Sequence, residues 1–207
     1  MLNVIAIKMH FPIYSQPMLE PVHLENDTLL IQSFNALDFQ RWPTMVSDIY
    51  AILSDSQSLK YLPFKRLNSI DDADTLLKNA LISLHCGRNY LHFIRKKKDG
   101  RIIGIIDIIS PDLAREHYNL QHYPYFIEFC LKTEYASKKL MSSLLPLFLD
   151  SLINQQIDDI AAVVNRLNIP AQKVLKRSGF SYHNFFDPTQ DIYRFKPTKL
   201  VPPNIFR

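Results

Sequence analysis

Glu128 is the residue of this chain best suited to accept a proton. It lies between Ile127 and Phe129 in an apolar run, and burial disfavours the charged form of a carboxylate. Its pKa would therefore rise toward neutrality, which is where a general base works best. A strand glutamate in this position can also face outward and pair with a lysine. The sequence leaves both interpretations open.

Three further residues near this run have weaker claims to a chemical role. Glu134, just beyond the run, could remove a proton through a water molecule. His117 and His122 precede the run and could line a cleft for the substrate, although most histidines in such places are plain loop residues. We therefore place the candidate base at Glu128.

Residues 165–180 have the spacing of a short loop followed by one compact helix. They come after an apolar, strand-like run at 160–164. Asn168 can cap the helix, Pro170 suits its first turn, and Gly179 can end it in a left-handed conformation. The segment therefore predicts a strand, a loop and a helix in direct succession.

This segment resembles a motif of the GCN5-related N-acetyltransferase (GNAT) superfamily, Asn-x-x-Ser/Ala-x-x-Val/Leu-x-x-x-x-Gly-Phe. The matching positions are Asn168, Ala171, Val174, Leu175, Gly179 and Phe180. The resemblance implies an enzyme that moves an acetyl group from acetyl-CoA to an amine, which could belong to a protein N-terminus, a lysine or a small molecule. The alternative is a catalytically silent protein of the same fold that acts as a binding or regulatory module.

The elements expected around the motif follow the order of that fold. Hydrophobic periodicity and turn residues predict strands at 28–34, 89–96, 101–109, 123–131, 157–164, 180–186 and 190–195, and helices at 38–53, 69–86, 138–154 and 168–178. This order resembles that of the GNAT fold, which implies an α/β class with a mixed central sheet flanked by helices. By resemblance, the sheet splays between its fourth and fifth strands. The layout is most similar to the branch of ribosomal-protein N-terminal acetyltransferases.

The resemblance also implies where acetyl-CoA would bind. The pantetheine arm would pair with backbone groups of Phe129, Cys130 and Leu131 beside the splayed gap. The pyrophosphate would lie against the start of the helix after that strand, because free N–H groups at a helix N-terminus bind phosphate. The residues placed there are Ser137, Lys138, Lys139, Leu140, Met141 and Ser142, and across the gap Asn168 and Ala171.

The pyrophosphate loop departs from the family pattern Arg/Gln-x-x-Gly-x-Gly/Ala. The three expected positions hold Ala136, Lys139 and Met141, and none of the four glycines of the chain lies in this loop. Leu175 stands where many relatives have a tyrosine that acts as a general acid. These departures favour either a modified CoA cradle or a fold that has lost tight CoA binding.

Length and composition allow one globular domain. Of 207 residues, 47% are hydrophobic, which excludes a disordered chain, and we expect an N-terminal extension at 1–26 packed on the domain, an acetyltransferase-like domain at 27–196 and a tail at 197–207. The net charge of +4 suits a polyanionic ligand but decides little.

The remaining expectations concern the cellular compartment and the binding partners. Cys86 and Cys130 are isolated among apolar neighbours, which indicates buried thiols in a reducing cytoplasm. The start of the chain lacks a basic signal segment, and no run approaches 18 apolar residues, so we expect no membrane contact. We expect no metal site and no nucleic-acid partner, and a monomer or homodimer.

Overall fold

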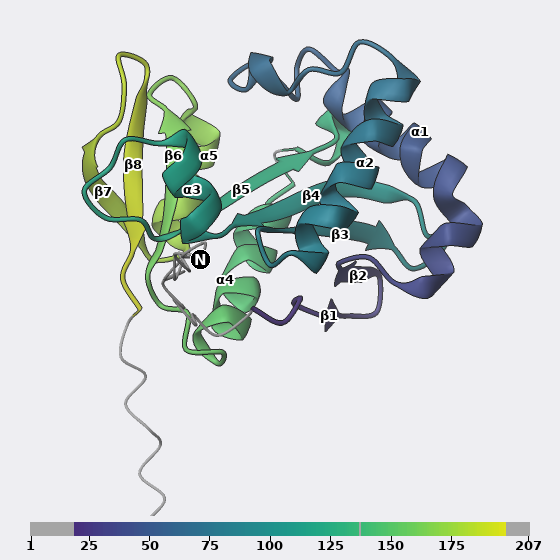
Figure 1. Ribbon diagram of the computed structural model, residues 1–207, viewed down its shortest axis with the longest axis horizontal. Coiled ribbons are helices and arrows are strands. Elements are labelled where there is room, and N and C mark those ends of the chain that lie inside the picture. Colours follow the sequence, from purple (N-terminus) through teal and green to yellow (C-terminus); the bar gives the residue numbers. More distant parts are fainter. Residues whose placement is uncertain (1–18, 137, 198–207) are drawn as a thin grey trace, which may run out of the picture.

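The computed structural model describes residues 19–136 and 138–197, which form one mixed eight-stranded sheet with helices on both faces (Figure 1). The strand order is β1-β2-β3-β4-β5-β6-β8-β7, and only β5 and β6 pair in parallel. The strands are β1 (Leu24–Glu25), β2 (Leu29–Gln32), β3 (Asn89–Lys96), β4 (Ile102–Ile109), β5 (Tyr125–Leu131), β6 (Ile160–Asn165), β7 (Phe180–Phe185) and β8 (Gln190–Phe195).

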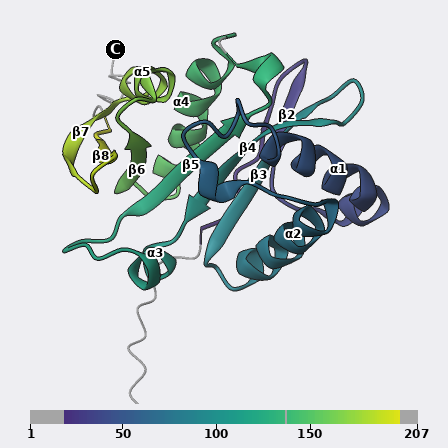
Figure 2. The ribbon, with the colours of Figure 1, turned by 90° about the horizontal axis from the view of Figure 1, so that it is seen from above.

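The helices are distributed over the two faces of the sheet (Figure 2). They are α1 (Trp42–Leu53), α2 (Ile70–His85), α3 (Pro111–His117), α4 (Leu140–Ile153) and α5 (Ile169–Arg177), with short 3-10 turns η1 (Ala36–Arg41), η2 (Pro63–Lys65) and η3 (Thr133–Tyr135). The pair α1 and α2 encloses one core cluster with side chains such as Ile49 and Phe93, α4 encloses a second with Phe148 and Leu149, and a third, smaller cluster lies beside α3. None of the helices that the structure describes is long and apolar enough to cross a membrane.

The two parallel strands separate soon after they meet. They pair only at Tyr125 with Ile160 and at Phe126 with Ala161, although β5 continues to Leu131. Figure 1 shows β5 and β6 diverging beyond this point. The predicted splay between these strands is therefore confirmed, and it leaves one edge of β5 unpaired.

Local sequence signals account for most element boundaries. Ser69 and Asp72 form the predicted capping box at the start of α2, and Gly100 adopts a φ of 67° in the β3–β4 hairpin. At η1 the cap is Asn35, and Asp38, expected to be the cap, is its capping-box partner. The reason is that the chain first makes a 3-10 turn before α1.

Several element boundaries and one whole element differ from the sequence predictions. The helix expected from 138 begins at Leu140, the strand expected from 123 begins at Tyr125, the strand expected from 157 begins at Ile160, and the helix α3 was missed. Ser110 caps α3 by accepting from the N–H of Leu113 at 3.2 Å, but seven residues are too few to show a helical period.

The N-terminal segment contacts the sheet where the structure describes it. Leu19 and Val22 are buried, and the N–H of Val22 donates to Nε2 of His92 at 2.9 Å. Residues 1–18 of the expected extension and residues 198–207 of the expected tail lie outside the described part of the chain. The division into 1–26, 27–196 and 197–207 stays a prediction.

Candidate functional site

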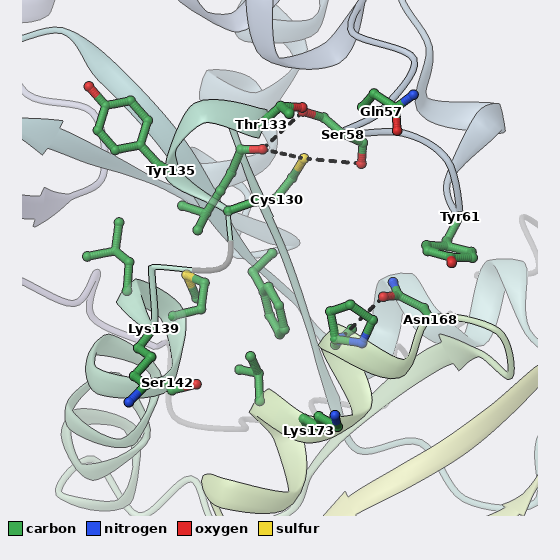
Figure 3. A pocket seen from close by; sticks show the side chains of 18 of the residues that line it. Gln57, Ser58, Tyr61, Cys130, Thr133, Tyr135, Lys139, Ser142, Asn168 and Lys173 are labelled. Carbon is green, nitrogen blue, oxygen red and sulfur yellow. Dashed lines mark hydrogen bonds between the residues drawn. The ribbon is translucent and has the colours of Figure 1, made fainter.

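A cavity of about 440 Å³ opens beside the unpaired edge of β5 (Figure 3). Its walls come from the end of β5, the start of α4, one face of α5 along its whole length and the loop after α1. The lining residues are Gln57, Ser58, Tyr61, Leu62, Phe129, Cys130, Leu131, Thr133, Tyr135, Ala136, Lys139, Leu140, Met141, Ser142, Asn168, Pro170, Ala171, Lys173, Val174 and Arg177. We call this the first cavity.

The splay leaves backbone groups of β5 directed at the first cavity. Successive residues of a strand direct their N–H and C=O groups to opposite edges. The N–H of Tyr125 bonds to the chain just before β6, at 3.0 Å, and the N–H of Lys132 bonds to β4, at 2.9 Å. The groups of Phe129 and Leu131 therefore face the gap, whereas those of Cys130 face β4. Of the three residues predicted for pantetheine, Cys130 can contribute only its side chain.

The start of α4 presents further donors to the same cavity. The first amide to find an acceptor within this turn is that of Ser143, which bonds to the carbonyl of Lys139 at 3.1 Å. The N–H groups of Leu140, Met141 and Ser142 have no acceptor within their own helix, and all three residues line the cavity. A helix N-terminus with free amides and a positive dipole end is an anion site.

Lys139 takes the backbone conformation for which glycine is usually selected. Its φ is 59° and its ψ is 8°, in the left-handed region. An L-residue there costs about 1–2 kcal/mol relative to glycine. The turn into α4 is therefore kept although the glycine expected by resemblance is missing from the loop.

The loop after α1 reaches the end of β5 through a set of polar contacts that the sequence did not predict. The hydroxyl of Ser58 lies 3.1 Å from the carbonyl oxygen of Leu131 and 3.0 Å from a carboxylate oxygen of Asp55, and the hydroxyl of Thr133 donates to Asp55. The hydrogen bond from Thr133 holds the pKa of Asp55 below its ordinary value. This loop lacks hydrophobic periodicity, so only the folded chain brings it to the site.

Most of the residues predicted to bind the cofactor line the first cavity. They are Phe129, Cys130, Leu131, Lys139, Leu140, Met141, Ser142, Asn168 and Ala171. Lys138 is not among the lining residues, and its ammonium lies 5.4 Å from the ring centre of Tyr135. Ser137 lies outside the described residues. Asn168 caps α5 as predicted, accepting from the N–H of Ala171 at 3.2 Å.

The two cysteines have different surroundings, which corrects the expectation that both are buried. Cys86 follows the last turn of α2 and is exposed, whereas Cys130 is buried. Burial raises the pKa of the Cys130 thiol to about 11. At neutral pH it is therefore a neutral wall of the first cavity rather than a nucleophile.

Glu128 lies on the other face of β5 from the side chains of Phe129 and Leu131. Its carboxylate forms an ion pair with Lys65 of η2, which is the lysine partner that the sequence left open. Across the β4–β5 ladder it lies opposite Asp107. Glu128 does not line the first cavity.

A second cavity, of about 560 Å³, lies between α2, η2 and strands β3 and β4. Lys65, Asn89 and Asp107 line it, and Asn89 donates to one oxygen of Asp107 at 3.2 Å. The other oxygen of Asp107 and the amide oxygen of Asn89 are buried without a partner among the described residues. Burial raises the pKa of Asp107 to about 6, although Lys65 opposes the shift.

The remaining sequence candidates lie away from both cavities. His117 is exposed at the end of α3, Glu134 is exposed in η3, and His122 contacts Asp159 at 2.5 Å on the surface. None of the three lines the first or second cavity. No group of three metal-binding side chains occurs within residues 19–136 and 138–197.

Comparison with known proteins identifies the family. The model of the acetyltransferase (GNAT) domain matches residues 37–181, more than half of the chain. The chain belongs to the GNAT acetyltransferase family. It is therefore an acetyltransferase, and acetyl-CoA is the co-substrate. No curated protein matches the chain by sequence.

Solved GNAT structures share the fold at low sequence identity. A GNAT acetyltransferase from Bacillus anthracis has a TM-score of 0.61 at 16% identity, covering 84% of this chain and 98% of its own. Ribosomal-protein-S5-alanine acetyltransferase from Vibrio fischeri has a TM-score of 0.63 at 14% identity, covering 84% and 94%. RimL, a ribosomal-protein alpha-N-acetyltransferase in complex with coenzyme A, has a TM-score of 0.60 at 14% identity, covering 84% and 97%.

The fold accommodates the residues that depart from the GNAT sequence pattern. Leu175, at the position of the family's tyrosine, is fully buried in the core, and its hydrocarbon side chain has no acidic proton to supply. Ala136 and Met141 line the first cavity beside Lys139, whose left-handed backbone replaces the missing glycine. The N-terminus of α4 therefore remains open to an anion.

Proposed function

We propose that this chain acetylates an amine by binding acetyl-CoA in the first cavity. The observation that carries the proposal is that one cavity joins the open edge of β5 to the free amides of α4. The backbone of Phe129 and Leu131 would pair with the pantetheine arm, and the amides of Leu140, Met141 and Ser142 would bind the pyrophosphate. Asn168 and Ala171 would form the opposite wall.

The acceptor amine would approach Glu128 from the side of α1 and α2, where the second cavity lies. Glu128 would take the proton of the amine, directly or through water, as its nitrogen attacks the thioester carbonyl. The new bond is the amide C–N bond, the C–S bond breaks, and the CoA thiolate takes a proton from water because Leu175 has none to give. Lys65 must release Glu128 for this step.

The acceptor class stays open between a protein N-terminus, a lysine side chain and a small amine. The structural likeness to ribosomal-protein acetyltransferases makes a protein N-terminus the first class to test. Two thiols without a disulfide fit a reducing compartment, so we propose the cytoplasm as the location.

Calorimetric titration of acetyl-CoA into the purified protein tests the proposal. We expect saturable binding at one site, followed by release of CoA when amine acceptors are added. Absence of binding at millimolar acetyl-CoA would contradict the proposed function.

A second candidate function is a catalytically silent member of the family that binds acetyl-CoA or a partner without turnover. The specific observation in its favour is that Leu175 and Ala136 replace two residues of the family pattern. Binding without CoA release over a broad set of peptide and small amines would favour it.

A further inference from the structure

Helix α5 contributes two positive charges to the first cavity that the proposed function does not use. Lys173 and Arg177 both line the cavity and lie one helical turn apart on the same face of α5. Both side chains are exposed. In the described part of the chain, no ion pair involves either of them, so their charges are available to a ligand.

The wall of the first cavity carries positive charge on α5 as well as at the start of α4. Lys139 lies at the α4 side and Lys173 lies on α5 across the pocket (Figure 3). No aspartate or glutamate is among the described residues that line the cavity. A site with several cations and no carboxylate fits a ligand with more than one anionic group.

We propose that Lys173 and Arg177 bind the 3′-phosphate of coenzyme A. The inference rests on the proposed function, because acetyl-CoA must already occupy the cavity. A phosphate monoester carries about −1.5 to −2 charges at pH 7, the largest charge on this ligand outside the pyrophosphate. A guanidinium fork binds two phosphate oxygens at once, and a lysine one turn away adds a point charge.

This subsite also accounts for a departure of the chain from its family. The family pattern places Arg or Gln at the position of Ala136, beside the pyrophosphate, and this chain has neither there. Lys173 and Arg177 restore cationic contact to CoA from the opposite wall. The donor is thereby held through its adenosine end as well as through α4.

The basic residues of α5 also have a plain structural use, because cations stabilise the C-terminal end of a helix. Lys176 shares that use, since it lies in the same last turn and is exposed. However, Lys176 does not line the cavity. It is therefore a matched control for charge and helix position without access to the ligand.

The test compares CoA with 3′-dephospho-CoA by calorimetric titration at fixed ionic strength. We expect the wild type to prefer CoA by about tenfold or more, the scale of one charge-assisted contact. The double variant Lys173→Ala, Arg177→Ala should bind both ligands equally, while Lys176→Ala keeps the preference. Circular dichroism of each variant checks that α5 is intact.

The outcomes separate this inference from the proposed function. Equal binding of CoA and 3′-dephospho-CoA by the wild type would overturn the 3′-phosphate subsite and leave acetyl-CoA binding in place. Loss of preference in Lys176→Ala as large as in the double variant would also overturn it, because the effect would then be one of net charge. If the wild type binds neither ligand, both proposals fall.

Discussion

At the scale of single residues, we propose that the chemistry of this site depends on Glu128. It directly precedes Phe129 of the first cavity, and its carboxylate contacts Lys65 of the second. Burial alone would lower the pKa of Lys65, but Glu128 and Asp107 outweigh that effect and keep it above its ordinary value. When no acceptor is bound, the protonated amine of Lys65 therefore contacts the Glu128 carboxylate. In the proposed reaction the acceptor amine would take that place.

We expect Glu128→Gln to lower turnover by roughly 10²-fold or more, the usual effect of removing one acid–base group. Glutamine keeps the size of the side chain but cannot take the proton. The binding of acetyl-CoA should not change, because Glu128 does not line the first cavity. The measurements are steady-state turnover with an amine that the wild type acetylates, and calorimetric titration of acetyl-CoA.

Glu134→Gln is the matched control, since Glu134 is an exposed carboxylate one turn beyond β5. Its turnover should equal that of the wild type. If Glu128→Gln also keeps full turnover, Glu128 is only the ion-pair partner of Lys65, and the base must be sought elsewhere.

At the scale of elements, the strand–turn–helix unit of β5 and α4 holds a strained residue where the ligand would bind. Lys139→Gly should raise the free energy of unfolding by about 1 kcal/mol, because glycine adopts the left-handed conformation without a Cβ clash. It should also reduce the salt dependence of CoA binding, since one cation near the pyrophosphate is lost. Urea unfolding and titration at two salt concentrations measure both effects.

Lys138→Gly provides the comparison for that change. Lys138 has the same charge and adjoins Lys139, but it does not line the first cavity. Glycine there adds only flexibility to the unfolded chain, so stability should fall slightly. Equal stability changes in the two variants would show that the conformation of Lys139 carries no strain.

The same element scale shows how far the sequence could predict this site. The cap at Asn168 follows from the residue types of the segment that ends at Phe180. The splay of β5 from β6 and the lining by Phe129 and Leu131 were implied by the resemblance of that segment to the GNAT motif. Two contacts of the site could not be predicted from the sequence. The contact of Ser58 with the carbonyl of Leu131 joins residues 73 positions apart, and nothing in the local pattern near Ser58 encodes that contact. The sequence allowed a lysine partner for Glu128, but it could not identify that partner as Lys65, which η2 brings to β5 only in the folded chain.

At the scale of the molecule, His92 connects three parts of the fold around one buried ring. It lies on β3, accepts from the N–H of Val22 and packs edge-on against Phe148 of α4, with ring centres 4.9 Å apart. Its Nδ1 is buried without a partner in the described part of the chain. Burial lowers the pKa of His92 from 6.5 to about 4, so the ring is neutral in the folded state.

Stability should therefore fall as the pH decreases from about 6.5 toward 4. Between these pH values His92 is protonated in the unfolded chain but neutral in the folded chain, so protonation favours unfolding. Above pH 6.5 His92 is neutral in both states, and its contribution to the free energy of unfolding is constant. Asp107 acts in the opposite sense between 3.8 and about 6, because its raised pKa lets the folded state bind the extra proton. The measured pH dependence of stability combines the opposing contributions of His92 and Asp107. A variant is therefore needed to separate them.

His92→Gln isolates the contribution of the histidine, since its amide oxygen can accept from Val22 but does not titrate. Between pH 7 and pH 5 the wild type should lose about 2 kcal/mol more than this variant in its free energy of unfolding, the linkage expected for roughly 1.5 pH units below the ordinary pKa. Urea unfolding at the two pH values gives the difference directly. Parallel losses in both proteins would contradict the prediction, because the folded and unfolded chains would then bind a proton at His92 equally well.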